Sequence, residues 1–218
     1  MDLKGKKILF LGDSITEGHG TSAPEHIYWQ VLARRTGAVC YANGVGGSRI
    51  APQYVPSEKP RHDLYFASRL GEMEDAADVV VVFGGTNDFG HGDAPFGAFD
   101  DRTEETFCGA FHVLLTKLIE KYPTAQLVVM TPLHRGAESN CGMNSRGVRR
   151  AADLESYVNA IIRIAGYYGI PVLDLFRVSG LQPSVPILKQ MYMPDGLHPN
   201  DAGHIRIAEK LIGFLQAL

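Results

Sequence analysis

The sequence has few cysteines and no long apolar run. Its 218 residues include only Cys40, Cys108 and Cys141, an odd number at wide spacings, which argues against a disulfide framework and a Cys-x-x-Cys metal site. We expect Cys40 and Cys108 to be buried small apolar side chains, and Cys141, in a polar segment, to be exposed. No stretch approaches the roughly 20 apolar residues of a membrane span, so none is predicted.

An excess of positive charge is also missing. The formal net charge is −3, which argues against a nucleic-acid partner. The N-terminal segment has lysines, but its apolar run covers only residues 8–11, shorter than the roughly 7–15 apolar residues of a signal peptide. A cytoplasmic location is therefore expected. His91, His134 and His204 lack the spacing of metal ligands, so we predict neither a metal nor a cofactor.

Apolar runs alternate with amphipathic patterns along the whole chain. Strands are predicted at residues 7–11, 39–42, 79–83, 126–130 and 171–173. Helical spacing covers residues 28–36, 104–122, 147–168 and 201–218. This alternation predicts a doubly wound α/β sandwich in a single domain, residues 1–218. Long loops are expected at residues 44–62, 84–102, 133–146 and 178–199, and three of them begin just after a predicted strand.

Ser14 follows the first predicted strand within a Gly-Asp-Ser sequence. Open α/β sheets bind ligands where their parallel strands end. A serine hydroxyl there is a potential nucleophile once a base removes its proton. The alternative is that Gly12, Asp13 and Ser14 merely form a turn, because all three residue types favour turns.

Asp195 and His198 lie three residues apart near the C-terminus. In a turn, the carboxylate can bind one ring nitrogen while the other nitrogen points outward, the arrangement of a base and its orienting group. Alternatively, the segment only begins the last helix and His198 is exposed beside it. Asn87, after the third predicted strand, can donate to an oxyanion, or it can simply belong to a glycine-rich turn.

These segments together resemble the four blocks of the GDSL-type SGNH hydrolases. The matching sequences are Gly-Asp-Ser at 12–14, Val-Gly-Gly at 45–47, Gly-Thr-Asn-Asp at 85–88 and Asp-x-x-His-Pro at 195–199. The resemblance implies a flavodoxin-like three-layer α/β/α sandwich with a central five-stranded parallel sheet, and metal-independent ester hydrolysis. It implies that Ser14 is the nucleophile, His198 the base and Asp195 its partner. The implied oxyanion donors are the backbone N–H groups of Ser14 and Gly47 and the Asn87 side chain.

The residues that flank these blocks are predicted to contact the substrate. They are Asp13, Gly46, Arg49, Asp88 and Phe89. The family often has Asp-Thr after its second-block glycine, where this chain has Ser48 and Arg49. That departure leaves the choice between Gly46 and Gly47 open, and it brings a cation near the acyl pocket.

Glycines near the nucleophile favour a small acyl group. Arginines at positions 135, 146, 149 and 150 favour a polar alcohol. The predicted function is therefore hydrolysis of acetyl esters of a carbohydrate. A short-chain lipase, a lysophospholipase-type esterase and an acyltransferase remain alternatives on the same scaffold.

Two unrelated folds fit the sequence less well. A nucleotide-binding domain is a remote alternative, because residues 18–23 nearly fit Gly-x-Gly-x-x-Ala but start well after the first strand. No acidic residue ends the second predicted strand, so the usual ribose contact is missing. The α/β-hydrolase fold is excluded because the chain has no Gly-x-Ser-x-Gly sequence.

Overall fold

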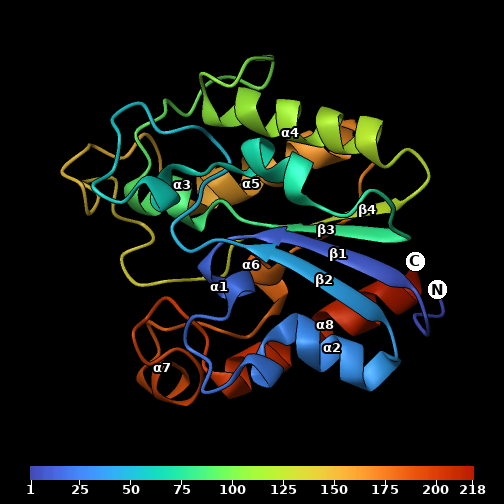
Figure 1. The fold of residues 1–218 in the computed structure, drawn as a ribbon. Coiled ribbons are helices and arrows are strands. Elements are labelled where there is room, and N and C mark those ends of the chain that lie inside the picture. Colours follow the sequence, from blue (N-terminus) through green and yellow to red (C-terminus); the bar gives the residue numbers. More distant parts are fainter.

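The five predicted strands form one parallel sheet. The computed structural model describes all residues 1–218, and the strand order is β2-β1-β3-β4-β5 (Figure 1). The strands are β1 (Lys7–Gly12), β2 (Val39–Gly44), β3 (Val79–Phe83), β4 (Gln126–Met130) and β5 (Val172–Leu173). Flavodoxin-like folds have this strand order, and the predicted fold is confirmed.

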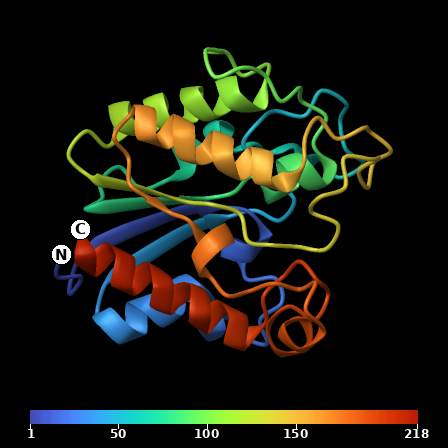
Figure 2. The same ribbon diagram turned by 180° about the vertical axis from the view of Figure 1, so that it is seen from behind.

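Helices cover both faces of the sheet (Figures 1 and 2). One face carries α3 (Thr86–His91), α4 (Phe107–Lys121), α5 (Leu154–Tyr167) and the 3-10 helix η3 (Phe66–Glu72). The other face carries α2 (Tyr28–Thr36) and α8 (Asp201–Ala217). The shorter elements are α1 (Ser14–Glu17), η1 (Pro24–His26), η2 (Pro60–Asp63), α6 (Leu175–Val178) and α7 (Pro186–Tyr192).

The strands have apolar side chains on both faces because each face is covered. In β1, Leu9 and Leu11 belong to the core under α4 and α5, whereas Ile8 and Phe10 belong to the core with α2 and α8. Successive side chains of a strand point to opposite faces. A central strand therefore reads as a continuous apolar run, which is why the sequence predicts these strands well.

Element boundaries differ from the prediction mainly where side chains cap helices. The helix predicted from residue 104 starts at Phe107, and the Thr106 hydroxyl accepts from the Gly109 N–H. The helix predicted from residue 147 starts at Leu154, capped by Asp153. The residues before these starts belong to the loops. The sequence did not predict α3, α6 or α7, which lie in or beside the predicted long loops, or the short helix α1, which directly follows β1.

The cysteines are all free. Cys108 is buried and Cys141 exposed, as predicted, while Cys40 is only partly buried. Cys40 lies in β2, the edge strand, where Val39 and Tyr41 are also exposed. Burial of Cys40 is incomplete because β2 has a hydrogen-bonded neighbour on one side only.

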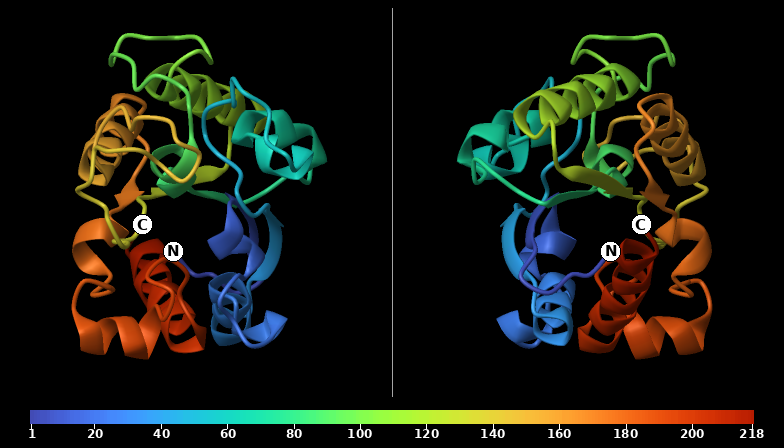
Figure 3. Two further views of the ribbon diagram at one scale, coloured as in Figure 1. Left: turned by 90° about the vertical axis from the view of Figure 1, so that its left-hand side faces the viewer. Right: turned by 90° about the vertical axis from the view of Figure 1, so that its right-hand side faces the viewer.

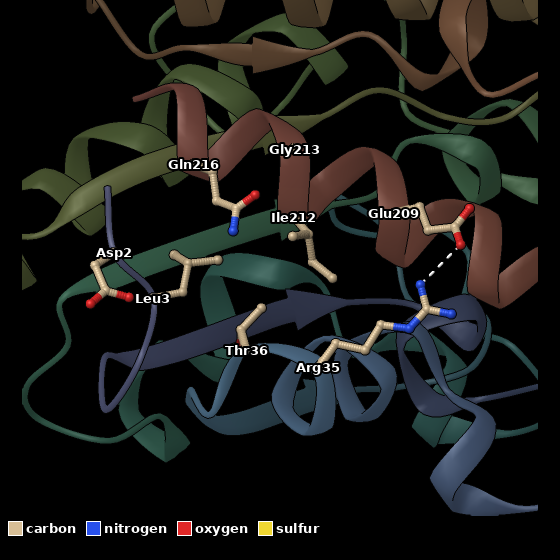
Figure 4. A pocket seen from close by; sticks show the side chains of 8 residues that line it. All are labelled: Asp2, Leu3, Arg35, Thr36, Glu209, Ile212, Gly213 and Gln216. Carbon is tan, nitrogen blue, oxygen red and sulfur yellow. Dashed lines mark hydrogen bonds and ion pairs between the residues drawn. The ribbon is translucent and has the colours of Figure 1, made fainter.

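The two termini lie close together at the amino ends of the strands (Figure 3). The N-terminal amine donates to the Gln216 carbonyl oxygen at 2.8 Å. A groove of about 440 Å³ lies beside them between α2 and α8, where Arg35 and Glu209 form an ion pair (Figure 4). This groove therefore lies toward the amino ends of the strands, whereas the predicted site lies at their carboxyl ends. No helix is both long and apolar enough to cross a membrane.

Candidate active site

Ser14 lies directly beyond the end of β1. Asp13 caps α1 by accepting from the Ile15 N–H at 3.0 Å, and Ser14 is the first residue of that helix. Gly12 makes the tight turn possible, because a Cβ atom there would lie 2.0 Å from the Thr16 hydroxyl oxygen. The chain therefore turns at once from strand to helix and places the serine at the carboxyl edge of the sheet.

His198 lies within hydrogen-bonding distance of Ser14, although 184 residues separate them. The Ser14 Oγ is 3.0 Å from His198 Nε2, and His198 Nδ1 is 2.7 Å from Asp195 Oδ2. The other carboxylate oxygen, Asp195 Oδ1, accepts from the backbone N–H groups of Leu197 and His198. Partial burial acts to raise the pKa of Asp195, but these hydrogen bonds outweigh it and hold the pKa below its usual range. The carboxylate thus stays charged and orients the imidazole.

Three hydrogen-bond donors belong to residues that line one cavity, namely Asn87, Gly47 and Ser14 itself. The Asn87 side chain, in the first turn of α3, donates one amide hydrogen to the Ser48 carbonyl oxygen at 2.9 Å and keeps the other free. Gly47 adopts a left-handed conformation with φ +78°, and its N–H has no protein acceptor. The Ser14 N–H begins a helix and has no intrahelical acceptor. Such N–H groups suit a developing oxyanion.

The donors and His198 open into one cavity of about 730 Å³. Apart from Pro56 and Leu197, its side chains are polar. The lining residues are Ser14, His19, Gly46, Gly47, Pro56, Ser57, Glu58, Lys59, Arg61, His62, Asn87, His91, Ser145, Arg146, Leu197 and His198. No group of three or more His, Cys, Asp or Glu side chains is arranged to hold a metal ion.

Of the five predicted substrate contacts, only Gly46 lines this cavity. The Gly46 N–H donates to Glu17 Oε2 at 2.7 Å, so this N–H is not available to an oxyanion. Between the two glycines, the geometry therefore favours Gly47. Asp13 is 2% exposed and serves as the cap of α1, which corrects its prediction as a substrate contact.

Arg49, Asp88 and Phe89 are also buried away from the cavity. Asp88 accepts from the N–H groups of Ile50 and Ala51 at 3.0 and 2.9 Å. Its helical position next to Asn87 turns it by roughly 100° away from the donors. Phe89 packs in the core under α4 and α5. The structure thus gives these side chains structural contacts in place of the predicted contacts with substrate.

Arg49 acts on the cavity only through its neighbours. It is 1% exposed and donates to His91 Nδ1 at 2.9 Å and to Asp63 Oδ1 at 3.2 Å. His91, for which the histidine spacing predicts no metal-binding role, does line the cavity. Its position four residues after Asn87 was the available signal, because residues i and i+4 share one helix face.

A second buried arginine braces the loops that carry the donors. Arg69, in η3, is fully buried. It donates to the Gly12 carbonyl oxygen at 2.9 Å, to the Asn43 carbonyl oxygen at 2.8 Å and to the Ser48 hydroxyl at 3.1 Å. One guanidinium thereby joins the ends of β1 and β2 to the loop after β2. No motif in the sequence predicts this role for Arg69.

Comparisons with known proteins identify the family of the chain. The GDSL-like lipase/acylhydrolase family matches residues 10–206. The chain belongs to this family. It is therefore a hydrolase acting on carboxylic esters, as predicted. A GDSL lipase of Mycobacterium tuberculosis is 27% identical to this GDSL hydrolase over 97% of the chain and 82% of the relative.

Solved structures have the same fold. A protein from Lactobacillus plantarum is 34% identical, with a TM-score of 0.81 and 98% of each chain covered. An acetyl xylan esterase is 22% identical, with a TM-score of 0.66, and covers 96% of this GDSL hydrolase and 99% of its own chain. At that lower identity the likeness concerns the fold alone.

Proposed function

We propose that the protein hydrolyses short-chain acyl esters, acetyl esters first, of a polar alcohol such as a carbohydrate, by a covalent mechanism at Ser14. The observation that carries the proposal is the continuous pair of hydrogen bonds from Ser14 to His198 to Asp195, at 3.0 and 2.7 Å. A serine next to an oriented imidazole is an activated nucleophile.

The reaction proceeds in two acyl-transfer steps. Ser14 Oγ attacks the ester carbonyl carbon while His198 Nε2 takes the hydroxyl proton. The tetrahedral oxyanion accepts from the Ser14 and Gly47 N–H groups and the Asn87 amide. Its collapse breaks the bond to the alcohol, which leaves with the proton from His198. Water then attacks the acyl-serine, again giving its proton to His198, and the acid is released as the serine regains the proton.

The shape and polarity of the cavity support the substrate class. At Gly47 an added Cβ atom would lie 3.0 Å from the His62 ring, so the space beside this donor is tight, which favours a small acyl group. The wider cavity has mainly polar walls, which suit a hydroxylated alcohol. The acetyl xylan esterase of the same fold is one protein for which this substrate class is named.

Replacement of Ser14 by alanine tests the nucleophile. We expect hydrolysis of p-nitrophenyl acetate to fall to the background rate, because no other hydroxyl lies at His198 Nε2. Ser22→Ala is the matched control, since its hydroxyl binds Asp201 and His26 outside the cavity. Wild-type turnover by Ser14→Ala would refute the mechanism.

A series of p-nitrophenyl esters from acetate to octanoate tests the acyl preference. We expect kcat/KM to be highest at acetate and to decline beyond butyrate. Rates that rise with chain length would support a lipase or lysophospholipase instead. Product analysis with a sugar acceptor present separates hydrolysis, which releases acetate, from acyl transfer, which gives an acetylated sugar.

A further inference from the structure

His91 has one ring nitrogen that the protein leaves unused. The residue ends α3, one helical turn beyond Asn87, and both side chains line the active-site cavity. Its Nδ1 is held by Arg49 at 2.9 Å, whereas its Nε2 makes no hydrogen bond within the protein. Side chains four residues apart on a helix have Cβ atoms about 5–6 Å apart. His91 therefore lies beside the oxyanion donors.

The contact with Arg49 determines which ring nitrogen of His91 carries the proton. A guanidinium has only donors, so His91 Nδ1 must be the acceptor, and the ring proton resides on Nε2. Burial, together with the charge of Arg49, lowers the pKa of His91 to about 4. His91 is consequently a neutral hydrogen-bond donor above that pH.

Arg146 supplies a positive charge near His91. The loop before it is joined to the chain on either side of His91, because the Ser145 N–H donates to the Gly90 carbonyl oxygen and the Asn144 side chain donates to that of Gly92. The guanidinium itself donates to Val55, Pro56 and Ser57. All three acceptors are uncharged.

No acidic side chain is in direct contact with the Arg146 guanidinium. The other charged groups on the cavity wall are Glu58, Lys59 and Arg61. Arg61 forms an ion pair with Glu17, and Glu58 and Lys59 are adjacent and of opposite sign. Arg146 forms no ion pair. The nearby carboxylates bind elsewhere: Asp63 pairs with Arg49, and Asp93 accepts from the Tyr54 and Val55 N–H groups. This part of the wall thus has hydrogen-bond donors and a guanidinium without a direct carboxylate partner.

We propose that His91 and Arg146 form a subsite that binds a carboxylate on the alcohol part of the ester. The inference rests on the proposed esterase function and narrows its substrates to acylated acidic alcohols, such as an acetylated sugar acid. A carboxylate has only acceptor oxygens, which match the two donors. Hydrogen bonds between a guanidinium and a carboxylate are among the strongest in proteins.

Two acetyl esters of equal shape test this subsite. In 4-acetoxybenzoate the leaving alcohol carries a carboxylate, and in 4-acetoxybenzamide it carries a neutral amide. The readout is the kcat/KM of the carboxylate ester divided by the kcat/KM of the amide ester. This ratio is compared between the wild type and each variant, so that the intrinsic reactivities of the two esters cancel. For Arg146→Gln we expect the ratio to fall about tenfold, mainly through KM of the carboxylate ester. In the wild type, the ratio should also fall as salt is added, since salt screens the charge.

Variants of His91 test the second donor. His91→Ala should lower the ratio about threefold to fivefold, and His91→Gln, which keeps an N–H donor, should preserve more of it. Arg35→Gln is the control for net charge, because Arg35 lines the groove between α2 and α8, toward the amino ends of the strands (Figure 4). The ratio measured for Arg35→Gln should match that of the wild type.

The outcomes separate this inference from the proposed function. If Arg146→Gln lowers both kcat/KM values equally, Arg146 only braces the loops and the subsite is refuted. A wild-type ratio that neither salt nor the variants change would also refute the subsite, while hydrolysis of both esters leaves the esterase function standing. If the wild type hydrolyses neither of these esters nor p-nitrophenyl acetate, the proposed function itself fails.

Discussion

Asn87 donates a hydrogen bond to the carbonyl oxygen of Ser48 at 2.9 Å. This bond joins the loop after β3 to the loop after β2, and both side chains are buried. It also leaves a single Asn87 amide hydrogen for the substrate and fixes its direction. One side chain therefore joins the two loops, and in the proposed mechanism it is also an oxyanion donor.

Replacement of Asn87 by alanine should reduce turnover strongly. Loss of one side-chain donor to an oxyanion typically costs about 2.7–4 kcal/mol of transition-state stabilisation, or roughly 100–1000-fold in kcat. We expect a loss in this range for p-nitrophenyl acetate, with KM changed less. Asn159→Ala is the control, since Asn159, in the middle of α5, accepts from Arg177 and does not line the cavity. A kcat within threefold of the wild type would show that Asn87 is not an oxyanion donor.

Asp195→Asn should impair catalysis while preserving the fold. The amide cannot stabilise the imidazolium that forms when His198 accepts the serine proton. Because the Asp195 side chain is 54% exposed, we expect a loss of about 100-fold or more in kcat, smaller than for a fully buried partner. Asp201→Asn is the matched control, as Asp201 is also partly exposed and binds Ser22 and His26. Equal losses in the two variants would contradict the assigned role.

Arg69→Met should destabilise the protein and lower its activity together. The substitution removes the three hydrogen bonds that the Arg69 guanidinium donates to the carbonyl oxygens of Gly12 and Asn43 and to the Ser48 hydroxyl. The Gly12 carbonyl oxygen still accepts from the Val45 N–H, so the cost is the loss of the bonds themselves. A hydrogen bond to a charged group contributes about 1.5–3 kcal/mol, and we expect the free energy of unfolding to fall by about 3 kcal/mol or more. Urea denaturation measures it.

Arg35→Met is the comparison for Arg69→Met, because it removes an exposed arginine whose ion pair is at the surface. It should change the free energy of unfolding by less than about 1 kcal/mol. Similar losses in the two variants would mean that Arg69 does not brace the strand ends. In Arg69→Met, a lower kcat at a temperature where the variant remains folded would show that the brace positions the donors.

His204 should make the fold sensitive to acid. It is fully buried, and its Nδ1 accepts from the Tyr28 N–H at 3.1 Å. Burial lowers the pKa of His204 from 6.5 to about 4. The unfolded chain therefore binds a proton more readily between these values, and stability present above pH 6.5 is lost as the pH falls toward 4. The loss is on the order of 3 kcal/mol.

Urea denaturation between pH 4 and 7 measures this effect in the wild type and in His204→Asn, whose side-chain oxygen can replace Nδ1 as the acceptor. We expect the variant to be less stable at pH 7, because it packs less well, but to lose less stability on acidification. The stability of the variant should still depend partly on pH, because the pKa of His91 is also lowered to about 4. An unchanged pH slope would contradict the assignment to His204.

The sequence predicts the sheet because each buried strand is a distinct apolar run. Residues 79–83 and 126–130 have the bounds that the structure gives to β3 and β4. Ser14, Asn87 and His198 could be found for a related reason. Each is a chemically distinctive residue in a short motif at the end of a strand or the start of a helix, and such ends meet at one edge of a parallel sheet.

The flanking residues were harder to predict because adjacent side chains point in different directions. Asp88 follows Asn87 in the chain, yet it faces Ile50 and Ala51 inside the protein. Arg69 had no local signal at all, since its partner Gly12 lies 57 residues away. A contact of this kind depends on how η3 packs over the ends of β1 and β2, which no short stretch of sequence encodes.

The separation of Ser14 and His198 along the chain has a consequence for biosynthesis. A ribosome makes the serine near the beginning and the histidine after 184 further positions, and the loop that bears His198 leads directly into α8, which must pack against α2. All five strands precede His198 in the chain, so the strands can be synthesised before the proposed base exists. Under the proposed mechanism, we expect ester hydrolysis only after the loop that bears His198 and α8 has been made and has docked.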